Sequence, residues 1–233
     1  PPEAVSRVHV EAAGETLDID YDFGSTPFYD LANDSLANWT LDKGQAKNTA
    51  SYDLPSNVTL VDGILSIRGA RERAPNGAAF TSGDAKGMHI PLFDEWTAEV
   101  VSQHSYGPGL WPCPFWTRRR DGGAGEIDLM EQFGTVPTIK STVHGPYGTP
   151  HPMVGRTRRW DTLPNPDPAA VHTWRIEKTK TGVKTYVDGL LIGEVTRAQA
   201  IAAGIPAGCI AITTKAIPDG KVSNHLVRTT RPG

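Results

Sequence analysis

Three carboxylates lie close together in the run Glu126-Ile127-Asp128-Leu129-Met130-Glu131. Only large apolar side chains separate Glu126, Asp128 and Glu131 from one another. Like charges at short range raise the pKa of each carboxyl group, and burial adds a desolvation cost. Stability alone rarely favours such an arrangement. The cluster therefore suggests acid–base chemistry carried out by paired carboxylates.

The spacing of the acids imposes a geometric condition on that chemistry. In a regular strand Glu126 and Asp128 share one face, and Glu131 points to the other. A single β-bulge between Asp128 and Glu131 returns all three to one face. The Cα atoms of the two glutamates would then lie roughly 13 Å apart, and their carboxyl groups could approach to about 5–6 Å. That separation is close to the ~5–5.5 Å of retaining glycosidases and below the ~6.5–9.5 Å of inverting ones.

Two other interpretations involve no chemistry. The acids could face water on an edge strand, since such a short pattern often occurs by chance. In a helix, Asp128 and Glu131 would form a solvated stripe. The flanking residues argue against both: Leu129, Met130 and Phe133 are too apolar for a solvated edge, and the glycines of 122–125 disfavour a helix start.

Aromatic residues are concentrated just before the acids. Trp111, Phe115 and Trp116 occur within eight residues. Flat aromatic faces pack against the C–H faces of sugar rings, so tryptophans beside paired carboxylates suggest a carbohydrate cleft. Packing in the core is the alternative for each tryptophan taken alone.

The elements that must position these residues are predicted to be strands. Alternation of apolar and polar residues and Asp-Gly turn signals favour strands rather than helices along most of the chain. One helix is expected at 196–203, where Thr196 and Gln199 fit a capping box and Gly204 follows. This pattern predicts an all-β fold of two stacked sheets, with residues 1–233 forming one domain. The expected strands are 17–23, 58–67 with a turn at 62–63, 97–102, 114–117, 126–133, 139–144, 172–178, 183–187, 190–195, 209–214 and 222–228.

Composition excludes several classes of function. A net charge of -3 over 233 residues gives no long-range attraction for nucleic acid or anionic membranes. No apolar run approaches the roughly 20 residues that cross a bilayer, and no nucleotide, zinc-protease or serine-hydrolase motif occurs. The two cysteines, Cys113 and Cys209, could form one disulfide in an exported protein or remain buried thiols.

Several motifs together resemble glycoside hydrolase family 16. They are Gly-Leu-Trp-Pro-x-x-Phe-Trp at 109–116, Gly-Glu-Ile-Asp-Leu-Met-Glu at 125–131, and a strand ending at His144. The resemblance extends in family order through 61–67, 80–83, 172–176 and 186–189. It implies a β-jelly-roll sandwich of two stacked antiparallel sheets with a concave substrate cleft. It also implies retaining hydrolysis of internal β-glycosidic bonds in polysaccharides.

The same resemblance assigns expected roles to individual residues. Glu126 would be the nucleophile and Glu131 the general acid/base, with Asp128 assisting by hydrogen bonding and charge. The expected substrate-binding residues are Trp111, Trp116, His144, Arg71 and Asn48.

The spacing of the acids also bears on the substrate. Within the family, Glu-x-Asp-x-x-Glu is usual in laminarinase-like β-1,3-glucanases, agarases and carrageenases, whereas lichenases and xyloglucan transferases have a shorter form. We therefore expect an endo-β-1,3-glucanase. The alternatives are activity on a mixed-linkage glucan or an anionic β-galactan, and a non-catalytic glycan-binding jelly roll. Two basic loops, 118–120 and 156–159, would bind an anionic glycan or simply face water.

The remaining expectations concern cofactors, partners and location. We expect no cofactor and no catalytic metal; a structural Ca²⁺ remains possible at Asp18, Asp20 and Asp22, which also fit a solvated strand face. The expected partner is a β-glucan polysaccharide, bound by a monomer with no nucleic-acid or membrane partner. Such a protein would be secreted or displayed at the cell surface.

Overall fold

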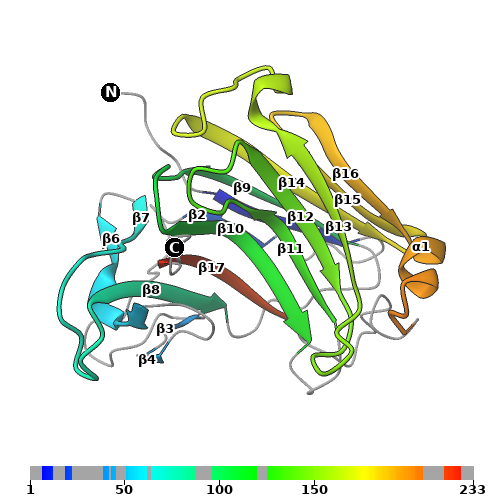
Figure 1. Ribbon diagram of the computed structural model, residues 1–233. Coiled ribbons are helices and arrows are strands. Elements are labelled where there is room, and N and C mark those ends of the chain that lie inside the picture. Colours follow the sequence, from blue (N-terminus) through cyan, green and yellow to red (C-terminus); the bar gives the residue numbers. More distant parts are fainter. Residues whose placement is uncertain are drawn as a thin grey trace.

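The computed structural model describes residues 7–12, 19–22, 39–41, 43–45, 51–61, 64–87, 96–119, 125–206 and 218–226 of the chain. These residues form mostly strands, and Figure 1 shows two curved sheets lying one behind the other. The predicted all-β sandwich of two stacked sheets is confirmed.

The smaller main sheet has six antiparallel strands. β14 shows why its residues form strands, since every second side chain is buried and Trp174 and Ile176 are fully enclosed. A period of two is the signature of a strand with one face on a core. The strand order is β16 (Leu190–Thr196), β15 (Gly182–Val187), β14 (Val171–Thr179), β9 (Trp96–Gln103), β1 (Arg7–Ala12) and β2 (Ile19–Asp22).

The larger sheet carries the acidic run near its middle. Its side toward the core is lined by apolar residues such as Ile127, Ile139 and Val143. All neighbouring strands are antiparallel except β5 and β8, which run parallel. The order is β13 (Met153–Arg159), β12 (Thr138–His144), β11 (Glu126–Glu131), β10 (Leu110–Arg119), β17 (Pro218–Leu226), β8 (Phe80–Gly87), β5 (Ser51–Asp53) and β4 (Gly44–Gln45), with β3 (Trp39–Leu41) also on β8.

The predicted hairpins and helix are present. β6 (Val58–Val61) pairs with β7 (Ile64–Ile67), and Asp188 and Gly189 both have positive φ at the β15–β16 turn. That combination is what a tight type I′ turn requires. Helix α1 (Arg197–Ala202) begins with the expected capping box between Thr196 and Gln199. Within the described ranges, no helix is both long and apolar enough to cross a membrane. Two short 3₁₀ turns, η1 (Pro55–Asn57) and η2 (Trp160–Thr162), complete the elements.

The prediction of two basic loops is wrong for the described arginines. Arg156, Arg158 and Arg159 lie on β13, and Arg118 and Arg119 lie on β10. β13 is the last strand of its sheet, and edge strands commonly carry charged residues that lack the apolar alternation of central strands. Strands β1 and β8 were likewise not predicted.

Some predictions fall on residues outside the described ranges. The predicted strand 209–214 and Cys209 are among them, so the disulfide stays a prediction, and Cys113 is buried on β10. Asp18 is also outside, whereas Asp20 and Asp22 lie on β2. The calcium site therefore remains an expectation.

Candidate active site

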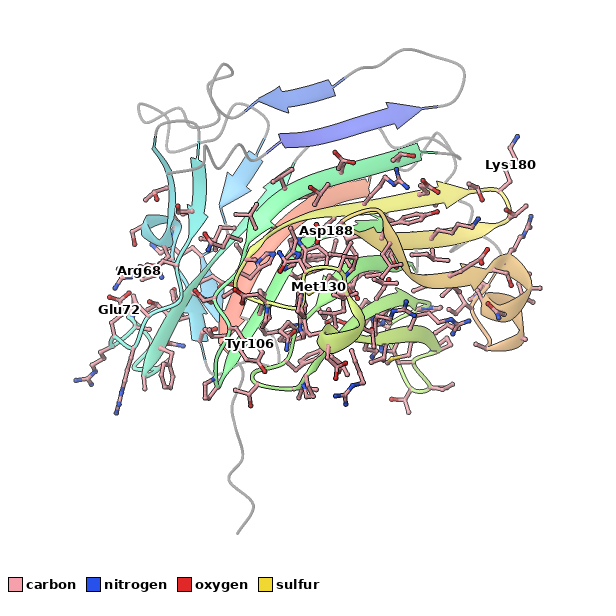
Figure 2. All side chains as sticks on the ribbon, turned by 90° about the horizontal axis from the view of Figure 1, so that it is seen from above. Arg68, Glu72, Tyr106, Met130, Lys180 and Asp188 are labelled. Atoms are coloured by element: carbon pink, nitrogen blue, oxygen red, sulfur yellow. The ribbon has the colours of Figure 1, made fainter. Side chains whose placement is uncertain are left out.

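The predicted bulge is present in β11. Asp128 pairs with Thr142 and Glu131 pairs with Lys140, so β11 uses three steps where β12 uses two. The extra residue comes from Leu129 and Met130, which are both almost fully buried, and Figure 2 marks Met130 among the densely packed interior side chains. The bulge is therefore held in place by two apolar side chains.

The bulge brings Glu131 to the face occupied by the other two acids, called here the acid face. It consists of Glu126, Asp128 and Glu131 with Thr142 and His144 of β12. The Thr142 hydroxyl donates a hydrogen bond to Glu131 Oε2 at 3.3 Å. Since Thr142 lies opposite Asp128, and His144 opposite Glu126, this contact fixes the common face.

Glu131 is in an environment suited to a proton donor. Its side chain is buried, and the indole N–H of Trp111 donates to its Oε1 at 3.1 Å. Burial first, and the neighbouring Asp128 charge second, raise the pKa of Glu131 from 4.5 to about 7. A carboxyl group with that pKa keeps its proton at mildly acidic to neutral pH, as a general acid requires.

Asp128 and His144 form a buried polar pair. Their side chains are 2.7 Å apart between Oδ2 and Nε2. Burial raises the pKa of Asp128 to about 7 and lowers the pKa of His144. Both shifts favour the neutral forms, so a single proton shared between the two groups holds them together.

Glu126 is the most accessible of the three acids. It is half-buried, and the hydroxyl of the exposed Tyr147 donates a short hydrogen bond to its Oε1. Tyr147 belongs to the segment after β12, where its ring lies 4.4 Å from the His151 ring between centroids. His151 in turn stacks on His144 and approaches its Nδ1 to 3.3 Å. Three aromatic rings thus connect this segment to the acid face.

The predicted substrate-binding residues fall into three groups. Trp116 and His144 lie next to the acids, since Trp116 pairs directly with Asp128 across β10 and β11. Trp111 contacts Glu131 through its N–H, so it also positions that carboxyl group. Arg71 follows the bridge of Ala70 with Thr81 and is exposed; Arg68 and Glu72 on either side of it lie well apart from Met130 in Figure 2. Asn48 lies outside the described residues.

Sequence reasoning did not identify Lys140, Tyr147 or His151 as part of this site. Lys140 lies opposite Glu131, and its positive charge acts against the rise of both the Glu131 and the Asp128 pKa. The Lys140 side chain lies over Gly155, and a Cβ atom added at Gly155 would come within 2.6 Å of Lys140 Cε. The strand period could have indicated Lys140, because residues 140, 142 and 144 alternate on β12. No such signal exists for Tyr147 and His151, which lie outside strands.

A divalent cation is a chemical possibility at these residues. Ligand atoms of Glu126, Asp128 and His144 lie within 4.8 Å of one another. The hydrogen bond between Asp128 and His144 already uses two of those atoms, so the group is also satisfied without an ion.

Comparison with known proteins gives a clear result only at the level of structure. No family model matches the sequence, and no curated protein matches it significantly. The endo-β-1,3-glucanase of Pyrococcus furiosus matches with a TM-score of 0.63 and 27% identity, over 84% of this chain and 80% of that one. The laminarinase catalytic domain of Thermotoga maritima matches with a TM-score of 0.67 and 21% identity, over 89% and 87%. SCLam, a non-specific endo-β-1,3(4)-glucanase from family GH16, matches with a TM-score of 0.67 and 20% identity, over 97% of this chain and 87% of that one.

These structures confirm the resemblance to family 16 laminarinases that the motifs indicated. The chain has the β-jelly-roll fold of those glucanases across most of its length. The class of protein that follows is a glycoside hydrolase.

Proposed function

We propose that this glycoside hydrolase cleaves internal β-1,3-glucosidic bonds in laminarin-like β-glucans with retention of anomeric configuration. The observation that carries the proposal is the bulge in β11, which places Glu131 on the face of Glu126 and Asp128. The printed names of the similar structures, a β-1,3-glucanase, a laminarinase and a β-1,3(4)-glucanase, support the substrate class.

The first step uses Glu126 as nucleophile and Glu131 as acid. A carboxylate oxygen of Glu126 forms a bond to the anomeric carbon while the bond to the leaving oxygen breaks. The proton of Glu131 passes to that oxygen, and the leaving sugar departs as an alcohol. The pKa of about 7 keeps Glu131 protonated for this step at acidic pH, and Tyr147 holds Glu126 by its hydrogen bond.

The second step releases the sugar from Glu126. The Glu131 carboxylate takes a proton from water as the water oxygen bonds to the anomeric carbon. The bond between that carbon and Glu126 breaks, which restores the Glu126 carboxylate and the protonated Glu131. Two displacements on opposite faces of the carbon give net retention.

The roles of the two acids are tested by substitution with matched controls. Glu126→Gln should abolish hydrolysis but leave folding and oligosaccharide binding intact, since glutamine has nearly the same shape. Glu72→Gln, at an exposed ion pair with Arg68, is the control and should retain activity. Full activity of Glu126→Gln would disprove the assignment of the nucleophile.

Retention itself is tested by following the first product. Proton NMR during early hydrolysis of a laminari-oligosaccharide should show the β-anomer before mutarotation. Azide added to Glu126→Ala should give an α-glycosyl azide, because the small anion attacks from the vacated side. Initial release of the α-anomer by the wild-type enzyme would refute double displacement.

The substrate is tested by a reducing-end assay on laminarin, lichenan, agarose and κ-carrageenan. Laminarin should give the highest rate, with short oligosaccharides appearing early because cleavage is internal. Binding of laminarin with no product from any of the four polysaccharides would instead support a non-catalytic glycan-binding module.

A second candidate substrate is an acidic β-galactan or a related acidic glycan. Lys140 beside Glu131 favours it, since a cation on the acid face could pair with a sulfate or carboxylate. A structure described with endo-acting O-glycanases that initiate mucin breakdown also matches, with a TM-score of 0.67 and 18% identity. Turnover of κ-carrageenan alone would replace the β-1,3-glucan proposal with this one. Either polysaccharide is too large to enter a cell, so we infer an exported enzyme.

A further inference from the structure

A hollow of about 340 Å³ lies between β13 and β16, the edge strands of the two sheets. It is called here the edge cavity, and its polar lining is Arg156, Arg158, Glu194, Thr196 and Gln199. Figure 1 shows β13 and β16 side by side, with α1 at one end of them. The volume of the edge cavity is at the low end of the range of about 300–1,000 Å³ that is typical of small-molecule sites, and most of it is open to solvent.

The edge cavity is on the opposite side of β13 from the acid face. Gly155 pairs with Thr142 of the acid face, whereas Arg156 and Arg158 pair with Ser141 and Ile139, which are buried toward the core. Side chains of paired residues point to the same side of a sheet. The two arginines therefore cannot contact a substrate held at Glu126 and Glu131, and any ligand of theirs occupies a separate site.

Arg156 is fixed in place without losing its charge. Its Nε donates to the Glu194 carbonyl at 2.8 Å, its Nη1 to the Gly155 carbonyl at 3.1 Å, and its Nη2 to Gln199 Oε1 at 2.8 Å. All three acceptors are uncharged. Gly193 permits this arrangement, because a Cβ atom there would lie 2.6 Å from Arg156 Cβ.

Arg158 is the second cation of the lining, and its charge is not paired with an acidic group among the described residues. Its Nε is buried and has no hydrogen-bond partner, and no ion pair is found for it within the described part of the chain. Because the protein encloses the Nε, an anion in the cavity would be bound through the terminal nitrogens of the Arg158 guanidinium group. The one acidic residue in the lining, Glu194, has its carboxylate 3.9 Å from Lys184. Two guanidinium groups against one carboxylate leave the cavity positively charged.

The chemistry of this lining selects an anion attached to an apolar surface. Guanidinium groups bind carboxylate and sulfate oxygens by paired hydrogen bonds. The exposed side chain of Leu191 on β16 adds apolar surface next to the two arginines. We propose that the edge cavity is a second saccharide site, which binds an acidic sugar unit through its carboxylate or sulfate group.

The proposal goes beyond hydrolysis at Glu126 and does not depend on it. An enzyme with such a site could hold an acidic polysaccharide, or an acidic branch of a mixed wall material, while the cleft engages a neutral chain. The site would then raise the local concentration of substrate without taking part in the reaction.

The test is calorimetric titration of the intact protein with glucuronic acid, galactose 6-sulfate and inorganic sulfate. Arg158→Gln should weaken binding of the sugars about tenfold or more, as expected for loss of hydrogen bonds to a charged group. Arg158→Lys keeps the charge but not the fork of donors, so it should give an intermediate loss, and it serves as the second variant if Arg158→Gln does not fold. Arg159→Gln is the control, because Arg159 lies on the other face of β13 in an exposed ion pair with Asp161.

Three outcomes would overturn the proposal. They are no binding of either sugar to the wild type, equal binding by the wild type and the Arg158 variants, or equal loss in Arg159→Gln. Binding of inorganic sulfate as tightly as galactose 6-sulfate would overturn the assignment to a sugar. Repeating the titration on Glu126→Gln saturated with a laminari-oligosaccharide separates this site from the cleft: unchanged affinity supports the proposal, and competition refutes it.

Discussion

Replacing Glu131 by glutamine should abolish activity and at the same time stabilise the fold above pH 7. Glutamine keeps the shape of the side chain and can still accept the hydrogen bond from Trp111 while its amide faces Thr142. It cannot ionise. The variant therefore removes the free-energy cost of placing a carboxylate in a buried site beside Asp128.

The magnitude follows from the pKa of Glu131. Its folded-state value of about 7 exceeds the ordinary value of 4.5, so between these values the folded state binds more protons than the unfolded state. Stability therefore falls as pH rises through this window, by about 3 kcal/mol in total. A protein of this size changes its melting temperature by about 2–4 °C per kcal/mol. Glu131→Gln should melt about 6 °C or more above the wild type at pH 8.

The assay is differential scanning calorimetry of both proteins at pH 4 and pH 8, with hydrolysis of laminarin measured in parallel. At pH 4 the wild-type carboxyl group is protonated in the folded state and mostly protonated in the unfolded state, so the two melting temperatures should nearly coincide. The stabilisation should appear only at pH 8. An equal difference at both pH values, or a variant that is less stable at pH 8, would refute the reasoning.

Two further predictions concern the neighbours of the proposed catalytic pair, Glu126 and Glu131. Asp128→Asn removes a negative charge that raises the Glu131 pKa, so the alkaline limb of the pH profile of kcat/KM should move to lower pH. An unchanged alkaline limb would show that burial alone sets the Glu131 pKa. Tyr147→Phe removes the hydroxyl that donates to Glu126, and kcat should fall about tenfold with KM little changed. Tyr106→Phe, which loses an exposed hydrogen bond elsewhere, is its control and should match the wild type.

The geometry of the acidic run was the most predictable part of the molecule. Strand periodicity requires a bulge if Glu126 and Glu131 are to share a face, and the bulge is found between Asp128 and Glu131. The capping box at Thr196 and the turn at Asp188 are equally local, since each depends on residues two to four positions apart. Short-range rules of this kind can be read from a sequence without knowledge of the fold.

Features that depend on contacts between distant segments could not be predicted in the same way. β8 was missed because Thr81, Ser82 and Asp84 are buried in it, and buried polar residues give no apolar alternation. The contact of Tyr147 with Glu126 depends on how the segment after β12 folds back, which periodicity does not determine. Arg158 was assigned to a loop because its side of an edge strand resembles a solvated surface.

In β11 the bulge compensates for one extra residue between Asp128 and Glu131. Leu129 and Met130 can each be replaced by another large apolar residue without changing which side chains lie on the acid face. Loss of a single residue between Asp128 and Glu131 would leave the spacing Glu-x-Asp-x-Glu, which places the three acids on one face of a regular strand without a bulge. If the bulge alone were lost and all residues were kept, Glu131 would turn toward the core, and the acid face would lose its proposed proton donor. The three acids therefore share a face either with the extra residue and the bulge together or with neither of them, but not with one alone.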